Sequence, residues 1–160
     1  MSLENWELAS YIVTVIGLPL AVFVFFVEQR KERDNEEEAG YQMLSDAYSD
    51  FLKVVLDNPD LRLRSAMHVA DLTPEQRERM QIIFEMLVAL FERAYLVAYE
   101  PAMQGEKARR WNSWADYMGE WCRREDFRRL LPTLLQGEDP DFAAYIGRLA
   151  AAEKARAQSG

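Results

Sequence analysis

The sequence predicts an all-α protein, with one N-terminal transmembrane helix followed by a cytoplasmic bundle of four to five helices. Three observations predict this fold. Residues 8–27 form a run of twenty residues without a charge. After residue 41, apolar residues recur at spacings of three and four, the period of a helix with one buried face. No stretch shows the apolar–polar alternation of a half-buried strand.

The uncharged run, residues 8–27, is long enough to cross a bilayer. At about 1.5 Å of rise per residue, a helix of this length extends roughly 30 Å, the thickness of the hydrocarbon core. A cleaved signal peptide is disfavoured, because Glu4 and Glu7 precede the run without any Lys or Arg, and no small-residue cleavage site follows it. A buried helix of a soluble domain is the other alternative.

The charges that flank this span predict its orientation. Arg30, Lys31 and Arg33 follow the span, whereas residues 1–7 contain no Lys or Arg. Positive residues stay on the cytoplasmic side of a membrane. We therefore expect a short extracytoplasmic N-terminus, residues 1–7, and a cytoplasmic remainder in a single-pass protein of the inner (plasma) membrane.

One face of the span carries small residues at spacings of three to four: Ser10, Thr14, Gly17 and Ala21. Small side chains let a second transmembrane helix approach closely. This face is therefore a candidate contact with another membrane subunit or with a second copy of the chain. The alternative is an ordinary anchor, in which the spacing has no function.

A charged segment, residues 28–40, separates the span from the folded domain. It reads EQRKERDNEEEAG and has almost no apolar surface to bury. We interpret it as a solvated stalk or linker, which can continue the membrane helix into water. We expect a break at Gly40, since glycine disfavours helix continuation.

Residues 41–152 form the predicted helical domain. Its first helix covers residues 41–57 and ends at Asn58-Pro59, because the residue before proline avoids helical angles. The buried stripe of this helix comprises Tyr41, Leu44, Tyr48, Phe51, Leu52 and Val55.

The strongest helix-start signal in the chain lies at Thr73, Pro74 and Gln76. It combines a hydroxyl at the N-cap, proline at the first helical position and glutamine at the third, as in a capping box. We expect this helix to continue to about Tyr99. Because residues 82–91 are apolar over most of the helix circumference, it is the predicted central helix.

Two more helices are predicted. The first carries an aromatic stripe, extends through residue 131 and ends or bends at Pro132. Its stripe comprises Trp111, Trp114, Met118, Trp121 and Cys122. The second starts with Asp139 as N-cap and Pro140 at the first position. It buries Phe142, Tyr145, Ile146 and Leu149, and we expect residues 153–160 to fray.

Composition excludes several classes of function. The formal net charge of −8 is unsuited to general nucleic-acid binding, which needs Lys and Arg against phosphates. Cys122 and His68 are the only cysteine and histidine, so histidine-rich metal sites and intrachain disulfides are ruled out. Glu85 and Glu92 share a helix face but lack the Glu-x-x-His pairs of di-iron bundles. We expect no metal, no cofactor and no catalytic site.

Residues 107–129 form a locally basic segment, with seven cations against four acidic residues. Docking to the anionic inner leaflet is one interpretation, at about 1 kcal/mol for each basic residue near the surface. Recognition of an acidic partner through Trp and Arg is another. A third is core tryptophans with solvated arginines. The candidate contact residues are Arg109, Arg110, Trp111, Trp114, Arg123, Arg124, Arg128 and Arg129.

The layout as a whole resembles a family of proteins. A span, a charged stalk, the segment YxxLxxxYxxFLKVVLDNPDLR, a long apolar helix and a tryptophan-containing helix follow one another. This order resembles bacterial single-pass membrane proteins whose helical cytoplasmic domain has no known function. The resemblance implies no activity and no catalytic residues.

These observations predict a non-enzymatic, membrane-anchored interaction protein. The leading hypothesis is an accessory or scaffolding subunit of an inner-membrane complex, with a respiratory or photosynthetic assembly as one host. Its partners would be the lipid bilayer and other membrane subunits or a second copy, but not nucleic acid. The alternative is a membrane-tethered sensor or effector, for example in stress or phage defence, that signals by oligomerisation. The sequence leaves open whether Trp111, Trp114 and Trp121 lie in the core or at an interface.

Overall fold

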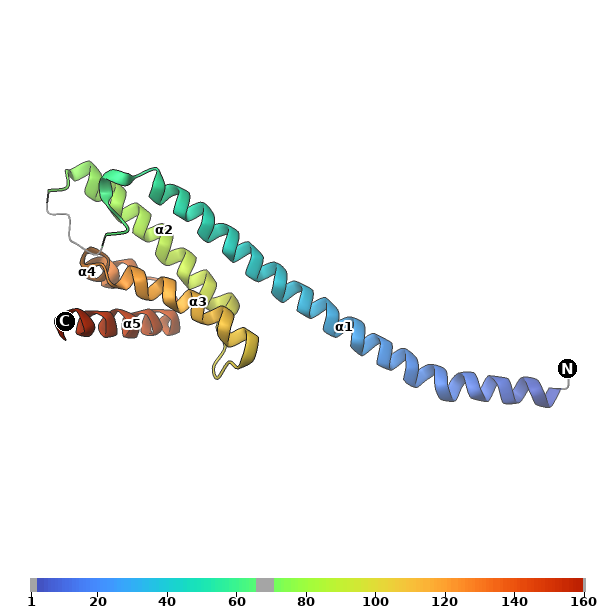
Figure 1. The fold of residues 1–160 in the computed structure, drawn as a ribbon. Coiled ribbons are helices and arrows are strands. Elements are labelled where there is room, and N and C mark those ends of the chain that lie inside the picture. Colours follow the sequence, from blue (N-terminus) through green and yellow to red (C-terminus); the bar gives the residue numbers. More distant parts are fainter. Residues whose placement is uncertain (1–2, 66–70, 160) are drawn as a thin grey trace. The chain divides into compact units, whose positions relative to one another are not determined.

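The computed structural model describes residues 3–65 and 71–159, and the side chains of residues 20–33, 35–65 and 71–158. Every regular element in these ranges is helical (Figure 1). The chain separates into two compact units, Met1–Gln42 and Met43–Gly160. The prediction of an all-α fold is confirmed.

The first unit is the N-terminal part of the helix α1 (Leu3–Leu56). The predicted break at Gly40 is wrong, because α1 is helical through this residue. A single glycine costs only about 1 kcal/mol in a helix interior, and the neighbouring glutamates and Ala39 are strong helix formers. The predicted stalk is therefore helical.

Apolar side chains of this unit are exposed from residue 20 onward. The large ones are 44 to 65% exposed and comprise Leu20, Val22, Phe23, Val24, Phe25, Phe26 and Val27. Ala21 is exposed as well, whereas Ser10, Thr14 and Gly17 lie outside the described side chains. Within the described part of the chain, no helix contains a stretch with both the length and the apolarity needed to span a membrane.

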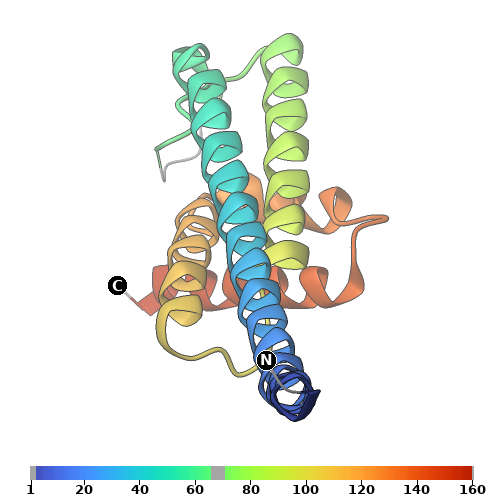
Figure 2. The ribbon, with the colours of Figure 1, turned by 90° about the vertical axis from the view of Figure 1, so that its right-hand side faces the viewer.

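The second unit is a helical bundle. It contains the end of α1, a short 3-10 helix η1 (Pro59–Leu61) and the four helices α2 (Pro74–Ala98), α3 (Gly105–Cys122), α4 (Glu125–Leu134) and α5 (Pro140–Ser159). The last turns of α1 lie beside α2, and α5 runs across α2 and α3 (Figures 1 and 2).

Both predicted helix starts are present. The Thr73 hydroxyl accepts a hydrogen bond from the Gln76 amide at 3.2 Å, and the Gln76 side chain accepts one from the Thr73 amide at 2.9 Å. Helix α2 then ends at Ala98, close to the predicted end. Asp139 caps α5 by accepting hydrogen bonds from the amides of Asp141 and Phe142, at 2.9 and 3.0 Å.

Two predicted boundaries are wrong. The aromatic helix does not extend to residue 131, because α3 ends at Cys122 and α4 begins at Glu125. Of the two alternatives at Pro132, an end or a bend, the end is wrong, because α4 continues to Leu134 and the proline removes one hydrogen bond in its last turn. The expected fraying from residue 153 is also wrong: α5 continues to Ser159, and Glu153 is only 9% exposed.

Aromatic side chains make up much of the core. Trp111, Trp114 and Trp121 are 2 to 4% exposed, which answers the question that the sequence leaves open. The indole nitrogens of two of them donate to tyrosine hydroxyls, Trp111 to Tyr145 at 3.0 Å and Trp121 to Tyr48 at 3.4 Å. Buried indoles need such partners, so these bonds fix α3 against α5 and against the end of α1.

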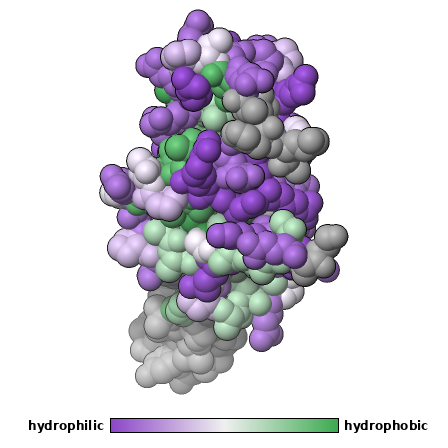
Figure 3. All heavy atoms as spheres, turned by 90° about the vertical axis from the view of Figure 1, so that its left-hand side faces the viewer, coloured by the Kyte–Doolittle hydropathy of each residue, from purple (hydrophilic) through white to green (hydrophobic). Residues whose placement is uncertain are grey.

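Polar side chains spread over much of the face shown in Figure 3, with smaller apolar areas between them. The exposed large apolar side chains of the second unit are Met43, Leu56, Ile82, Met86, Leu96 and Val97. The last four lie on α2 and are 46 to 59% exposed. Their spacing puts them on one face of the helix, which we call the α2 stripe.

Candidate functional site

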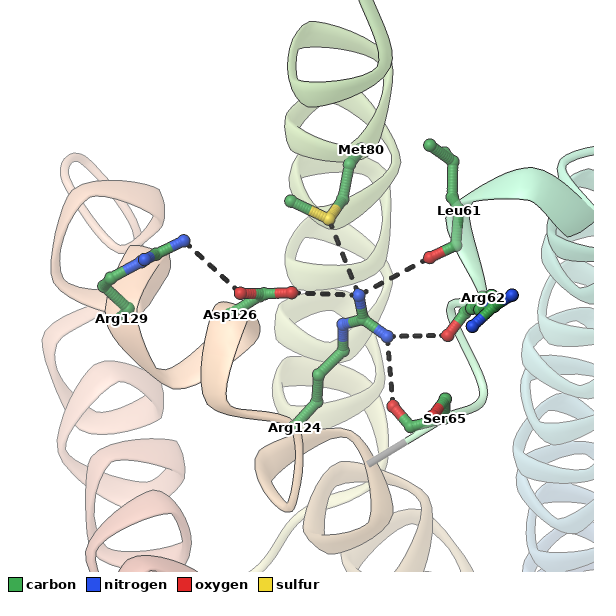
Figure 4. A network of polar contacts seen from close by, with 7 residues as sticks. All are labelled: Leu61, Arg62, Ser65, Met80, Arg124, Asp126 and Arg129. Atoms are coloured by element: carbon green, nitrogen blue, oxygen red, sulfur yellow. Dashed lines mark hydrogen bonds and ion pairs between the residues drawn. The ribbon is translucent and has the colours of Figure 1, made fainter. Parts of the chain in front are cut away.

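The junction between α3 and α4 contains the most unusual side chain of the bundle, Arg124, which is 2% exposed (Figure 4). Its Nη1 donates to the carbonyls of Arg62, at 2.7 Å, and Ser65, at 3.0 Å. Its Nη2 donates to the Asp126 carboxylate at 2.9 Å. Arg124 therefore ties the loop after η1 to the start of α4.

Burial has electrostatic consequences at this junction. It lowers the pKa of Arg124, and the charge of Asp126 opposes that shift. Asp126 is fully buried and also pairs with Arg129 at 3.3 Å, so one carboxylate serves two guanidinium groups. The Nε of Arg124 is buried and has no hydrogen-bond partner in the described part of the chain.

Two further arginines hold the ends of neighbouring helices. Arg128 donates to the carbonyls of Cys122 and Arg123, which the end of α3 leaves without helical partners. Arg123 pairs with Glu153 of α5 at 3.3 Å. Glu153 also pairs with Arg156, so a second carboxylate is shared by two arginines.

The structure does not bring the eight predicted contact residues onto one surface. Trp111, Trp114 and Arg124 are buried, so contact with a leaflet or a partner through them would require their removal from the core. Arg110 pairs with Glu106 at 2.7 Å, and Arg128 binds carbonyls. The exposed members are Arg109, Arg123 and Arg129, for which the predicted contact stays a prediction.

A hollow of about 250 Å³ lies beside the junction. Its lining comprises Leu63, Arg64, Ser65, Glu120, Trp121, Arg123 and Arg124. The Arg64 guanidinium lies over the Trp121 indole, 5.6 Å from the ring centroid, and pairs with Glu120 at 2.8 Å. The sequence could indicate the arginines that follow α3, Arg123 and Arg124, but it could not show that Arg64 lines the same hollow.

The predicted acidic face of α2 has separate roles along its length. Glu85 is exposed and accepts a hydrogen bond from Gln81 at 3.0 Å. Glu92 accepts a hydrogen bond from the Asp139 amide at the start of α5. Hydrogen bonding to Glu92, burial and the negative charge of Glu92 together raise the pKa of Glu138 to about 7. No three potential metal ligands cluster among the described residues.

Cys122 is fully buried, and burial raises the pKa of its thiol to about 12. A reactive thiolate is therefore disfavoured, and the placement of Cys122 in the predicted stripe with the buried tryptophans is confirmed. His68 lies outside the described residues.

Comparisons with protein-family models, with curated proteins and with solved structures found no match to this chain.

Proposed function

We propose that this chain is a non-enzymatic, membrane-anchored interaction protein, an accessory or scaffolding subunit of an inner-membrane complex. In this proposal residues 8–27 anchor the chain, and the bundle, residues 43–160, contacts other subunits on the cytoplasmic side. The proposed host is a membrane complex, for example a respiratory or photosynthetic assembly.

The observation that carries the proposal is the exposed apolar run of α1. From Leu20 to Val27, seven large apolar side chains are at least 44% exposed. Full burial of such a side chain is worth roughly 1.5–3 kcal/mol, so a run of seven in water is strongly unfavourable. The run continues an uncharged sequence that begins at residue 8 and is followed by Arg30, Lys31 and Arg33. A bilayer would bury the apolar side chains, and a cytoplasmic position of residues 28–160 would place Arg30, Lys31 and Arg33 on the side of the membrane where positive residues stay.

The surface of the bundle supports interaction with a protein subunit. The α2 stripe exposes Ile82, Met86, Leu96 and Val97, and large exposed apolar areas mark contact sites. Exposed arginines of α3 and α4 add charged contacts. Such features suit a docking surface, whereas a catalytic site would need polar groups that converge in a deep pocket.

The first experiment tests the anchor. Native membranes are washed with alkaline carbonate, and the chain is followed in the pellet. A double variant, Ile16→Arg with Leu18→Arg, places two charges at the centre of the predicted span, where each costs about 2.5–3.5 kcal/mol. We expect this variant to leave the membrane fraction. The control, Ser45→Arg with Ser49→Arg, adds the same charge to exposed positions of the second unit and should stay in the pellet. Recovery of the unmodified chain in the soluble fraction would overturn the anchor.

The second experiment tests the accessory role. After gentle detergent extraction, native mass spectrometry identifies the assembly that contains the chain. A larger complex of fixed stoichiometry is expected. A lone chain or homo-oligomer would contradict the accessory role and favour a membrane-tethered sensor. One observation favours that second candidate, namely the hollow beside Arg124, since a sensor needs a place for a ligand.

A further inference from the structure

The hollow between the loop after η1 and the α3–α4 junction has the surroundings of an anion site. Arg64, Arg123 and Arg124 line it, and Glu120 is the single acidic residue of the lining. Its volume of about 250 Å³ is below the roughly 300–1,000 Å³ of pockets for drug-sized ligands. At ~30 Å³ for each water of the liquid, it has room for about eight waters, or for one small polar group.

The carboxylates near the hollow do not match the guanidinium groups one for one. Asp126 is shared by Arg124 and Arg129, and Glu153 is shared by Arg123 and Arg156. With Glu120, which pairs with Arg64, three carboxylates thus serve five guanidinium groups. Positive charge is therefore in excess among these side chains, although the whole chain has a formal net charge of −8. Such local excess attracts anions.

The buried member of the lining provides an independent observation. Arg124 is 2% exposed, and its Nε lacks a partner in the described part of the chain. A buried guanidinium normally uses all its donors, because an unsatisfied buried donor is costly. Its remaining bonds go to neutral carbonyls and to the shared Asp126. Among these partners of the Arg124 guanidinium, Asp126 is the one with a negative charge, and Asp126 also pairs with Arg129.

Arg64 is a solvent-exposed component of the site. Its side chain is 53% exposed, and its partner Glu120 is 41% exposed. Ion pairs with this exposure are weak, so a bound anion can compete with Glu120 for the guanidinium. The stacking on Trp121 keeps Arg64 at the rim of the hollow.

We propose that this hollow binds a phosphate group, held by Arg64 and Arg123 at the rim beside the buried charge of Arg124. Guanidinium groups match phosphate oxygens with two parallel hydrogen bonds. The phosphate can belong to a soluble small molecule or to a lipid headgroup. This inference rests on the residues that line the hollow and does not depend on the membrane anchor.

Binding is measured on the full chain in a non-ionic detergent by isothermal titration calorimetry, with inorganic phosphate as the probe and chloride keeping the ionic strength constant. A second arm measures binding to neutral vesicles with and without phosphatidic acid. Phosphate stabilises proteins generally by exclusion from their surface, so saturable binding is the criterion. Saturable binding in the first arm identifies a soluble phosphate ligand, and binding only to the phosphatidic acid vesicles identifies a lipid headgroup.

The test variant is Arg64→Gln with Arg123→Gln. It should weaken binding at least about tenfold, because charge-assisted hydrogen bonds are lost. The control, Arg93→Gln with Arg148→Gln, removes the same charge from exposed positions of α2 and α5. It should leave the affinity within about twofold, since neither residue lines the hollow and both are exposed.

A third variant, Glu120→Gln, keeps the test decisive if the double variant does not fold. It removes the competing carboxylate, so it should tighten phosphate binding. Three results would overturn the site: no saturable binding of phosphate or of phosphatidic acid vesicles, equal losses in the test and control variants, or weaker binding by Glu120→Gln.

Discussion

Two apolar helical runs of this chain have similar composition but different surroundings. Residues 20–27 of α1 read LAVFVFFV, and residues 82–91 of α2 read IIFEMLVALF. In the first run, the large side chains are 44 to 65% exposed. In the second, Phe84, Leu87 and Phe91 are completely buried.

The difference lies in how each run is arranged around its helix. One side of the α2 run faces water and carries both polar and apolar side chains, such as Glu85 and Met86. The other side of the run packs against α3, α4 and α5. The α1 run has no polar side to turn toward water. A helix that is apolar all round needs neighbours on every side, and the described side chains of its own unit leave the α1 run exposed. An apolar composition therefore predicts that a helix is buried. The distribution of apolar residues around the helix predicts whether its own bundle or other surroundings bury it.

The largest expected effect contrasts one phenylalanine from each run. Phe84 packs edge-on against Trp121 and Phe127, with ring centroids 6.3 and 5.2 Å away. Phe84→Ala should lower the free energy of unfolding of the bundle by about 3–5 kcal/mol. Phe25→Ala should change it by less than about 0.5 kcal/mol, as at other exposed sites. Urea denaturation followed by tryptophan fluorescence measures both. Equal losses would mean that the α1 run also belongs to the folded core.

The next effect concerns the polar junction that covers the start of the α2 run. Arg124 lies 3.8 Å from the Met80 sulfur of α2 and compensates the buried Asp126. Arg124→Gln should lower the free energy of unfolding by roughly 3 kcal/mol, at the lower end for broken buried pairs, because Arg129 remains beside Asp126. Arg129→Gln should cost less than about 1 kcal/mol, since its side chain is 61% exposed. Equal costs in thermal denaturation would contradict the assignment of Arg124 as the main partner of Asp126.

A smaller effect is expected at the start of α2. Thr73→Ala removes the acceptor for the Gln76 amide and should cost about 1 kcal/mol. Thr73→Ser keeps the hydroxyl and should be nearly neutral. Chemical denaturation compares the two variants. A loss as large in Thr73→Ser would show that the methyl group, and not the cap, stabilises the helix.

The smallest effect is a pH dependence at the other end of α2, where Glu92 meets Glu138. The pKa of Glu138 rises from 4.5 to about 7 on folding, so the folded state binds more protons between these values. The contribution of Glu138 to stability is therefore full below pH 4.5 and falls as the pH rises to about 7. Glu138→Gln should remove this decline, whereas Glu78→Gln, an exposed control on α2, should retain it. Identical profiles of melting temperature against pH for all three proteins would contradict the carboxyl pair.

Local signals in the sequence predicted most of the helices. The capping box at Thr73 and the aspartate–proline pair at residue 139 each placed a helix start, because these side chains bond to the first turn of their own helix. Most residues of the buried stripes were also readable, since three-and-four spacing lines up neighbouring turns. Four of the predicted stripe residues are only half-buried: Tyr41, Leu52, Tyr145 and Leu149. The helix ends expected at Gly40 and Pro132 are absent, because flanking helix formers and tertiary packing override a single helix-breaking residue.

The candidate site was less accessible from the sequence. The arginines at residues 123, 124, 128 and 129 look alike there, but their surroundings differ. Arg124 is buried by the loop after η1, which lies about sixty residues earlier in the chain, as its bonds to Arg62 and Ser65 show. Arg129, five residues later, is mostly exposed.

The sequence by itself determined the all-α class, the start of each capped helix and the side of each helix that turns inward, because these depend on residues within a few turns. Only the tertiary structure decided which arginine is buried, that Trp121 donates to Tyr48, 73 residues away, and that Arg64 lines the hollow beside Arg124. Such pairings depend on how helices approach one another in space. The spacing of residues along the chain does not determine how the helices pack against one another.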